Sequence, residues 1–250
     1  MKKETKEVAK RDTTALDISR GSFAGLMDET PVESSDFLIP KILLMQSMST
    51  MVQEEKARAG EIRGSVNNNK LAEKEGNVEI IAFKMFKTWV TISTVGNEYL
   101  GQVPFTPENC LKAQDEVVGG VAVKNFKTLN YFCIVPSEIA GGVFMPYVVS
   151  FRSTSYKAGK ALETIRGKLQ GYGKPLPFVT INLGSVAKEN DKGKFFEYTV
   201  TEGRETTDQE LTAVKKWFDI INVENIKVDD SDLDKEKITV EPKVAPGEEY

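Results

Sequence analysis

The chain has 250 residues, of which 40% are hydrophobic and 28% are charged, and a formal net charge of −4. This composition is typical of a globular protein with a sizeable core. No apolar run approaches the ~20 residues that a membrane-spanning helix needs, and no apolar segment follows the basic N-terminus as it would in a secretory signal. We therefore expect a cytoplasmic protein that does not associate with membranes.

Two residue types narrow the chemistry. Histidine is absent, which removes Ser-His and Cys-His nucleophile pairs, histidine-ligated zinc and the commonest general base. Cys110 and Cys133 are too far apart in sequence to predict a disulfide framework, and they lack the spacing of metal ligands. The sequence therefore predicts a protein that is not an enzyme and has no metal or cofactor. Catalysis by carboxylates and lysines alone is the remaining alternative.

Charge is unevenly distributed along the chain. Residues 228–250 contain eight acidic and three basic residues, a net charge of −5, and the first 36 residues have a net charge of −2. The segment between them therefore has a net charge of +3. This division is a pattern of nucleic-acid-binding proteins with an acidic tail. We expect a flexible arm over 1–36, one domain over 37–228 and a disordered acidic tail over 229–250.

The ordered part is predicted to begin at "DFLIPKILLMQ", where Pro40 requires an extended or turn conformation. A glycine-punctuated loop follows over 54–76. Segments rich in β-branched and aromatic residues then predict strands over 78–93, 125–137, 142–152, 177–186 and 194–203. A turn at Asp191–Gly193 joins the last two strands as a hairpin.

Two helices are predicted. The first lies within 153–173, with Ser153 or Ser155 as its cap and glycines at its end. The second covers 207–222, with Thr207 as its cap and an apolar face formed by Leu211, Val214, Trp217, Phe218 and Ile221. Because strands and helices do not alternate, a parallel sheet is disfavoured. We predict a mainly β (α+β) protein with a small antiparallel β-barrel and one or two helices.

The stretch "AFKMFKTWV" mixes aromatic rings with lysines inside a predicted strand. Alternation places one set of side chains on the expected core face: Ile81, Phe83, Met85, Lys87 and Trp89. The other face has Ile80, Ala82, Lys84, Phe86, Thr88 and Val90. Phe86, between Lys84 and Thr88, is therefore the ring that we expect to stack on a base. The alternative is a half-buried strand whose lysines extend to solvent.

Two further segments combine rings with basic residues. In "KNFKTLNYFC", Lys124 and Phe126 alternate to one side, and Lys127 and Tyr131 to the other. The segment 150–178 has a single acidic residue, Glu163, against six basic ones: Arg152, Lys157, Lys160, Arg166, Lys168 and Lys174. Tyr156 and Tyr172 accompany them. A solvated amphipathic helix is the alternative for this segment.

Several features recur in a familiar order over residues 37–202. They are "FLIPKILLMQSMS", a glycine-rich loop, an aromatic strand ending in "TWVTIS", "VVSFRSTSYKAGKALETI" and "DKGKFFEYTV". This order resembles bacteriophage single-stranded DNA-binding proteins of the OB-fold kind. The resemblance implies a five-stranded barrel and a role in phage replication or recombination in the infected host cell. It also implies that the acidic tail contacts replication or recombination proteins and competes with DNA.

The leading hypothesis is therefore non-specific binding of single-stranded DNA by aromatic stacking and by Lys and Arg contacts to phosphate. The candidate binding residues are Lys84, Phe86, Lys124, Phe126, Lys127, Tyr131, Arg152, Tyr156, Lys157, Lys160, Arg166, Lys168 and Lys174. The alternative is a phage virion or assembly protein with a β-rich interaction domain, which would be found in the virion. A homo-oligomer is compatible with either hypothesis.

Overall fold

The computed structural model describes residues 38–66, 68–95, 99–106, 116–118, 120–140, 145–191, 193–223 and 227–228. The predictions for the arm over 1–36 and the tail over 229–250 lie outside these residues. Among the described helices, none is long and apolar enough to cross a membrane.

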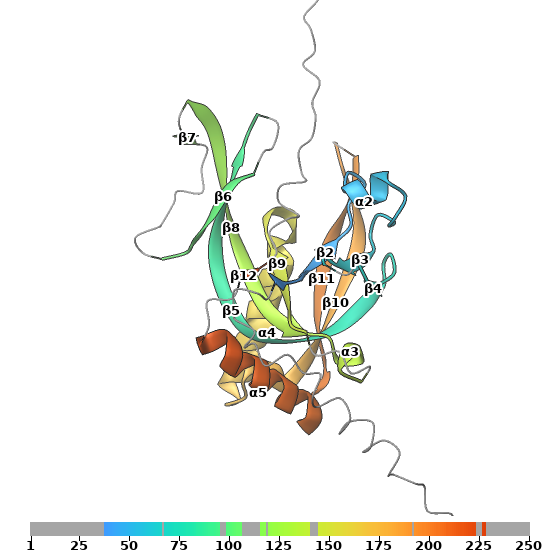
Figure 1. Ribbon diagram of the computed structural model, residues 1–250, viewed down its shortest axis with the longest axis vertical. Coiled ribbons are helices and arrows are strands. Elements are labelled where there is room, and N and C mark those ends of the chain that lie inside the picture. Colours follow the sequence, from blue (N-terminus) through green and yellow to red (C-terminus); the bar gives the residue numbers. More distant parts are fainter. Residues whose placement is uncertain are drawn as a thin grey trace, which may run out of the picture.

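Ten of the described strands form one mixed sheet (Figure 1). Its strands are β2 Lys41–Leu44, β3 Ile62–Gly64, β4 Lys70–Ala72, β5 Asn77–Ser93, β6 Tyr99–Pro104, β7 Glu116–Val118, β8 Val121–Ile134, β9 Tyr147–Phe151, β10 Val179–Asn190 and β11 Gly193–Glu205. The order is β11-β10-β5-β8-β9-β2-β3-β4, with β6 paired to β5 and β7 paired to β8. Two short strands, β1 (Leu38–Ile39) and β12 (Lys227–Val228), form a separate parallel pair.

The described helices are α2 Thr50–Gln53, α3 Pro136–Ala140, α4 Tyr156–Gly171 and α5 Asp208–Val223. Both long helices and all five strands that the sequence predicts are present, with shifted ends. The short strands β2, β3, β4, β6 and β7 were not predicted, because three to six residues give too little periodicity to recognise.

The expectation of a closed antiparallel barrel is wrong. The sheet is open and mixed, with β2 and β9 parallel and no backbone ladder between its two outermost strands, β4 and β11. Side chains connect the regions near these ends. Gln46, just after β2, exchanges two hydrogen bonds of 2.9 Å with the backbone of Phe196 in β11. Tyr198 donates to the carbonyl oxygen of Ile42 at 3.0 Å. The sheet is therefore curved as in a barrel, but without the hydrogen-bonded seam.

Each long helix covers one side of the curved sheet. α4 lies on the inside of the curve, and α5 crosses the outside (Figure 1). Leu162 and Leu169 of α4 belong to a large buried cluster with Ile80, Tyr131 and other sheet residues. Val214 and Ile221 of α5 belong to a second, smaller cluster on the opposite side. We call these two sides of the sheet the α4 side and the α5 side.

A β-bulge in β5 changes which side its residues face. The register with β8 shifts between Ala82 and Lys84, so that Phe83 is the extra residue. Phe83 and, further along, Phe86 both pack on the α5 side, whereas Met85 packs on the α4 side. The prediction that Phe83, Met85 and Trp89 share one face is therefore wrong. Beyond the bulge, Lys87 and Trp89 follow Met85 to the α4 side by alternation.

A capping box begins α5. The backbone N–H of Thr207 donates to Glu210 Oε2 at 2.7 Å, and the N–H of Glu210 donates to Thr207 Oγ1 at 3.3 Å. Thr207 is therefore the predicted cap. Arg204, at the end of β11, adds two hydrogen bonds to Glu210, of 2.7 and 3.0 Å. The Arg204 guanidinium is the main reason that the pKa of Glu210 is lowered to about 2.

We expect Glu210→Gln to lower the free energy of unfolding by about 2 kcal/mol at pH 7, because the charge-assisted hydrogen bonds are lost. The folded-state pKa lies below the usual 4.5, so this stabilisation is present above pH 4.5 and disappears as the pH falls toward 2. Urea unfolding at several pH values measures it, and the variant should lose less stability over that range. Glu205→Gln is the control, because that carboxylate is exposed. Equal pH profiles for wild type and Glu210→Gln would contradict the expectation.

Candidate nucleic-acid interface

The first two predicted site residues lie under α5. Phe86 is half-buried, its ring centroid is 5.1 Å from that of Phe132, and it packs against the cluster that α5 covers. Lys84 Nζ donates to the carbonyl oxygen of Ile221 at 3.3 Å, near the C-terminal end of α5, where a cation interacts favourably with the helix dipole. In this structure both side chains hold α5 on the sheet.

Tyr131 lies on the α4 side and is completely buried. Its hydroxyl donates to Glu163 of α4, which also accepts hydrogen bonds of 3.0 and 2.6 Å from Arg166. Burial and the Glu163 carboxylate raise the pKa of Tyr131. Burial also tends to raise the pKa of Glu163, but the hydrogen bonds from Arg166 and Tyr131 lower it overall. The bond between Tyr131 and Glu163 thus anchors α4 to β8, and Arg166 holds the Glu163 carboxylate from within α4.

The basic residues near the end of α4 pair with β11. Lys168 lies 2.8 Å from Glu202, and Lys174 lies 3.4 Å from Glu205 and 3.9 Å from the ring centroid of Phe178. Both lysines line a surface pocket of about 320 Å³ that also includes the exposed ring of Tyr172. This end of the basic segment therefore carries carboxylates that offset its charge.

Beyond Met85, β5 and its neighbours form a sheet extension that projects away from α5 (Figure 1). We call this extension the wing. It consists of residues 87–93 of β5, residues 121–128 of β8, the edge strands β6 and β7, and Phe105 just after β6. Lys124 and Phe126 lie on its α5 side, where the ammonium is 5.5 Å from the ring centroid.

The α4 side of the wing combines two rings with two lysines, which we call the wing cluster: Lys87, Trp89, Phe105 and Lys127. Trp89 is opposite Val103 in β6 and Lys127 in β8. The backbone N–H of Phe105 donates to the carbonyl oxygen of Lys87 at 3.0 Å, which places Phe105 beside Lys87. The Phe105 ring centroid is 5.5 Å from that of Trp89 and 4.5 Å from Lys127 Nζ.

The first turn of α4 is directed toward this cluster. Gly159 packs closely on β8, because a Cβ there would lie 3.0 Å from Leu129 Cδ1. One turn later, Glu163 bonds to Tyr131. The preceding turn therefore lies toward Lys127. That turn contributes Tyr156, the exposed Lys157 and, just beyond it, the exposed Lys160, whose ammonium is 5.3 Å from the Tyr156 ring centroid.

Thus the fold brings four of the predicted residues near one another: Lys127, Tyr156, Lys157 and Lys160. Arg152 immediately precedes the 3-10 turn Ser153–Ser155 that leads into α4. Sequence reasoning placed Trp89 in the core and did not select Phe105. Phe105 follows β6, a short edge strand that the sequence does not predict, so no local pattern marks it. Only the register of β6 against β5 shows that Phe105 meets Trp89.

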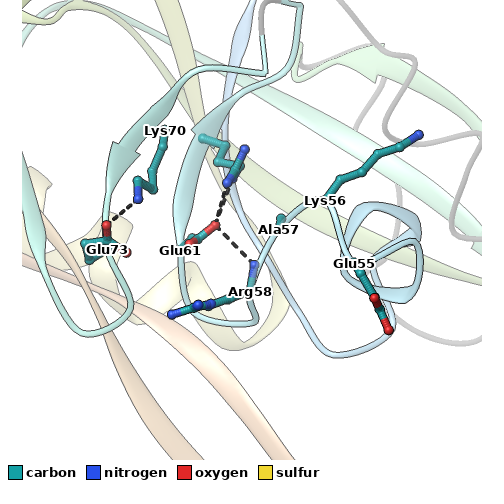
Figure 2. Close-up of a pocket in the computed structure, with 8 residues that line it drawn as sticks. Glu55, Lys56, Ala57, Arg58, Glu61, Lys70 and Glu73 are labelled. Atoms are coloured by element: carbon teal, nitrogen blue, oxygen red, sulfur yellow. Dashed lines mark hydrogen bonds and ion pairs between the residues drawn. The ribbon is translucent and has the colours of Figure 1, made fainter.

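A second surface pocket, of about 420 Å³, is polar (Figure 2). The buried Glu61 carboxylate accepts from the Arg58 backbone N–H at 3.1 Å and from Arg63 Nε at 2.9 Å. Burial tends to raise the pKa of Glu61, but these hydrogen bonds and the Arg63 charge lower it overall. Lys70 pairs with Glu73 in the same pocket. Because these charges neutralise one another and no aromatic residue lines the pocket, it is a poorer candidate than the wing cluster.

The described residues contain no group of three or more acidic, cysteine or histidine side chains that could hold a metal ion. Cys133 is buried in the core, and burial raises the pKa of its thiol. A reactive thiolate is therefore not available there.

The fold and the wing cluster define a mainly β protein built on an open mixed sheet, with an aromatic and basic surface on one side. A family model described as Pam3 phage gp34-like protein matches residues 6–225, and the chain belongs to this family. The expectation of a bacteriophage protein is therefore confirmed. Neither a curated protein nor a solved structure matches the chain.

The packing of Phe86 leads to a stability prediction. Phe86→Ala removes a half-buried ring from the interface between β5 and α5, and we expect it to lower the free energy of unfolding by about 2 kcal/mol. A urea titration measures this loss. Oligonucleotide affinity of the folded variant should stay unchanged. Normal stability combined with weakened DNA binding would instead identify Phe86 as a base-stacking residue.

Proposed function

We propose that this protein binds single-stranded DNA without sequence preference, through the α4 side of the wing and the first turns of α4, during phage replication or recombination. The wing cluster carries the proposal. The rings of Trp89 and Phe105 lie together, the Lys127 ammonium lies over the Phe105 ring, and Lys87 is on the same side of β5. Rings stack on any base, and lysines contact the phosphates regardless of sequence.

The distribution of paired charges supports this location. Arg166, Lys168 and Lys174 are each bonded to a carboxylate. The lysines near the wing cluster differ, since the interactions of Lys127 and Lys160 are with the rings of Phe105 and Tyr156. A phosphate competes more easily with a ring than with a carboxylate for an ammonium group. We therefore propose Lys127, Lys157 and Lys160 as the phosphate contacts, with Arg152 beside them.

The function is tested by titrating a fluorescently labelled oligo-dT at two salt concentrations and following its anisotropy. We expect binding at low salt that weakens as salt rises, because each phosphate contact on a single strand changes the slope of log K against log salt by about 0.7. Absence of binding at low salt, or an affinity independent of salt, would refute the proposal.

Lysine substitutions locate the binding surface. Lys127→Ala and Lys160→Ala should each weaken oligo-dT binding and make the salt slope shallower by about 0.7. Lys188→Ala is a control matched to Lys160→Ala, because Lys188 is exposed as Lys160 is but lies near the distant β10–β11 turn. A loss as large for Lys188→Ala as for the other two would show that the binding is diffuse and not localised at the wing.

The acidic tail gives a further prediction. Residues 229–250 have a net charge of −5, against −4 for the whole chain, and we propose that they contact replication or recombination proteins and compete with DNA. A chain ending at Val228 should therefore bind oligo-dT more tightly, mainly at low salt where charges are least screened. The same anisotropy titration measures this. Equal affinity for the full and shortened chains would contradict competition by the tail.

A specific observation also favours the second candidate, a virion or assembly protein. The wing exposes several large apolar side chains: Val95, Leu100, Val103, Val117 and Val121. Exposed apolar side chains beside edge strands are features of protein interfaces. Mass spectrometry of purified phage particles separates the two candidates. Presence in the particle, together with indifference to free oligo-dT, would establish the second.

A further inference from the structure

One buried donor in the wing has no acceptor. The Trp89 side chain is almost completely buried, with 5% of the residue exposed, and its Nε1–H group makes no hydrogen bond. Buried polar groups are nearly always paired, and leaving one unpaired costs free energy. The Trp89 Nε1–H group is therefore a hydrogen-bond donor without an acceptor, at the centre of the wing cluster.

The side chain that covers Trp89 cannot provide that acceptor. The centroid of the Phe105 ring lies 5.5 Å from that of the Trp89 ring, and the two planes make an angle of 34°. Lys127 Nζ lies 4.5 Å from the Phe105 centroid. A phenyl ring offers no in-plane acceptor to the indole N–H. It also satisfies the ammonium only through its π face, which is a weaker partner than an anion.

We propose that Phe105 occupies the place of a nucleobase, and that a base of single-stranded DNA stacks on Trp89 after the Phe105 side chain has swung away. The Trp89 Nε1–H points outward in the plane of the indole, so a carbonyl oxygen or ring nitrogen of the neighbouring base, at the edge of the indole, would accept it. The adjoining phosphate would contact Lys127. This inference rests on the proposed function and identifies the stacking position within that interface.

The backbone permits this exchange. The Phe105 N–H bond to the Lys87 carbonyl oxygen and the Thr106 N–H bond to the Pro104 carbonyl oxygen involve main-chain atoms only. Rotation of the Phe105 side chain about χ1 breaks neither. The site also selects for single strands, since a base in a duplex already stacks on both faces and has its pairing edge occupied.

Two substitutions test the exchange by oligo-dT anisotropy. Phe105→Ala removes the competing ring, so we expect affinity to rise by roughly fivefold, the factor that corresponds to releasing one aromatic pair. Trp89→Phe keeps a stacking ring but removes the N–H, so affinity should fall by roughly threefold, as for one lost hydrogen bond. An oligonucleotide of abasic sites should show neither effect.

Fluorescence gives an independent readout. The chain has two tryptophans, Trp89 and Trp217. Trp217→Phe leaves Trp89 as the only tryptophan, and Trp217 packs on the α5 side of the sheet, opposite to Trp89. Oligo-dT should quench Trp89 in this background. Phe126→Ala is the matched control, because Phe126 also lies beneath a lysine but on the α5 side of the wing. Oligo-dT should still quench Trp89 in the Phe126→Ala variant.

Phe105→Leu, which retains apolar bulk, should also raise the affinity for oligo-dT if Phe105→Ala fails to fold.

The outcomes separate this inference from the proposed function. Salt-dependent oligo-dT binding with unquenched Trp89, or weaker binding in both Phe105 variants, would overturn the inference and leave DNA binding in place. Absence of oligo-dT binding by the full-length chain at low salt would overturn both.

Discussion

The arrangement of side chains around the sheet depends on one extra residue in β5. Phe83 faces α5 as Ile81 does, and the bulge there turns the later Phe86 toward α5 and sends Met85, Lys87 and Trp89 to the α4 side. Without this bulge, strict alternation would put Phe86 and Trp89 on the opposite sides from those they occupy. A bulge also increases the local twist of a strand, and β5 is one of the two strands, with β8, that run from the rest of the sheet into the wing.

The sheet is curved without being closed. The outermost strands, β4 and β11, have no ladder between them, and side-chain hydrogen bonds of Gln46 and Tyr198 instead join β11 to the region of β2. The large core cluster fills the inside of the curve together with α4. β5 and β8 extend beyond this core and form the wing with β6 and β7. The candidate interface is therefore on the part of the sheet that projects away from α5 (Figure 1).

The lysines and arginines among the candidate binding residues differ in what surrounds them. Those toward the end of α4 are paired with carboxylates, Lys84 is bonded at the end of α5, and Lys127 and Lys160 lie against aromatic rings. Charge counting treats all of them as equal. Their capacity to bind an anion differs, because a carboxylate partner must first be displaced, and an ammonium over a ring keeps its outer side available. This contrast explains why we place the interface at the wing.

The sequence by itself determined the long elements, since alternation, caps and turn residues act over a few neighbouring positions. It predicted β5, β8, β10, β11 and both long helices, including the Thr207 cap of α5. It could not determine the bulge at Phe83, the parallel pairing of β2 with β9, or the meeting of Phe105 with Trp89. These features depend on strand register and on contacts between segments distant in sequence, which are selected by the packing of the whole core and leave no local pattern.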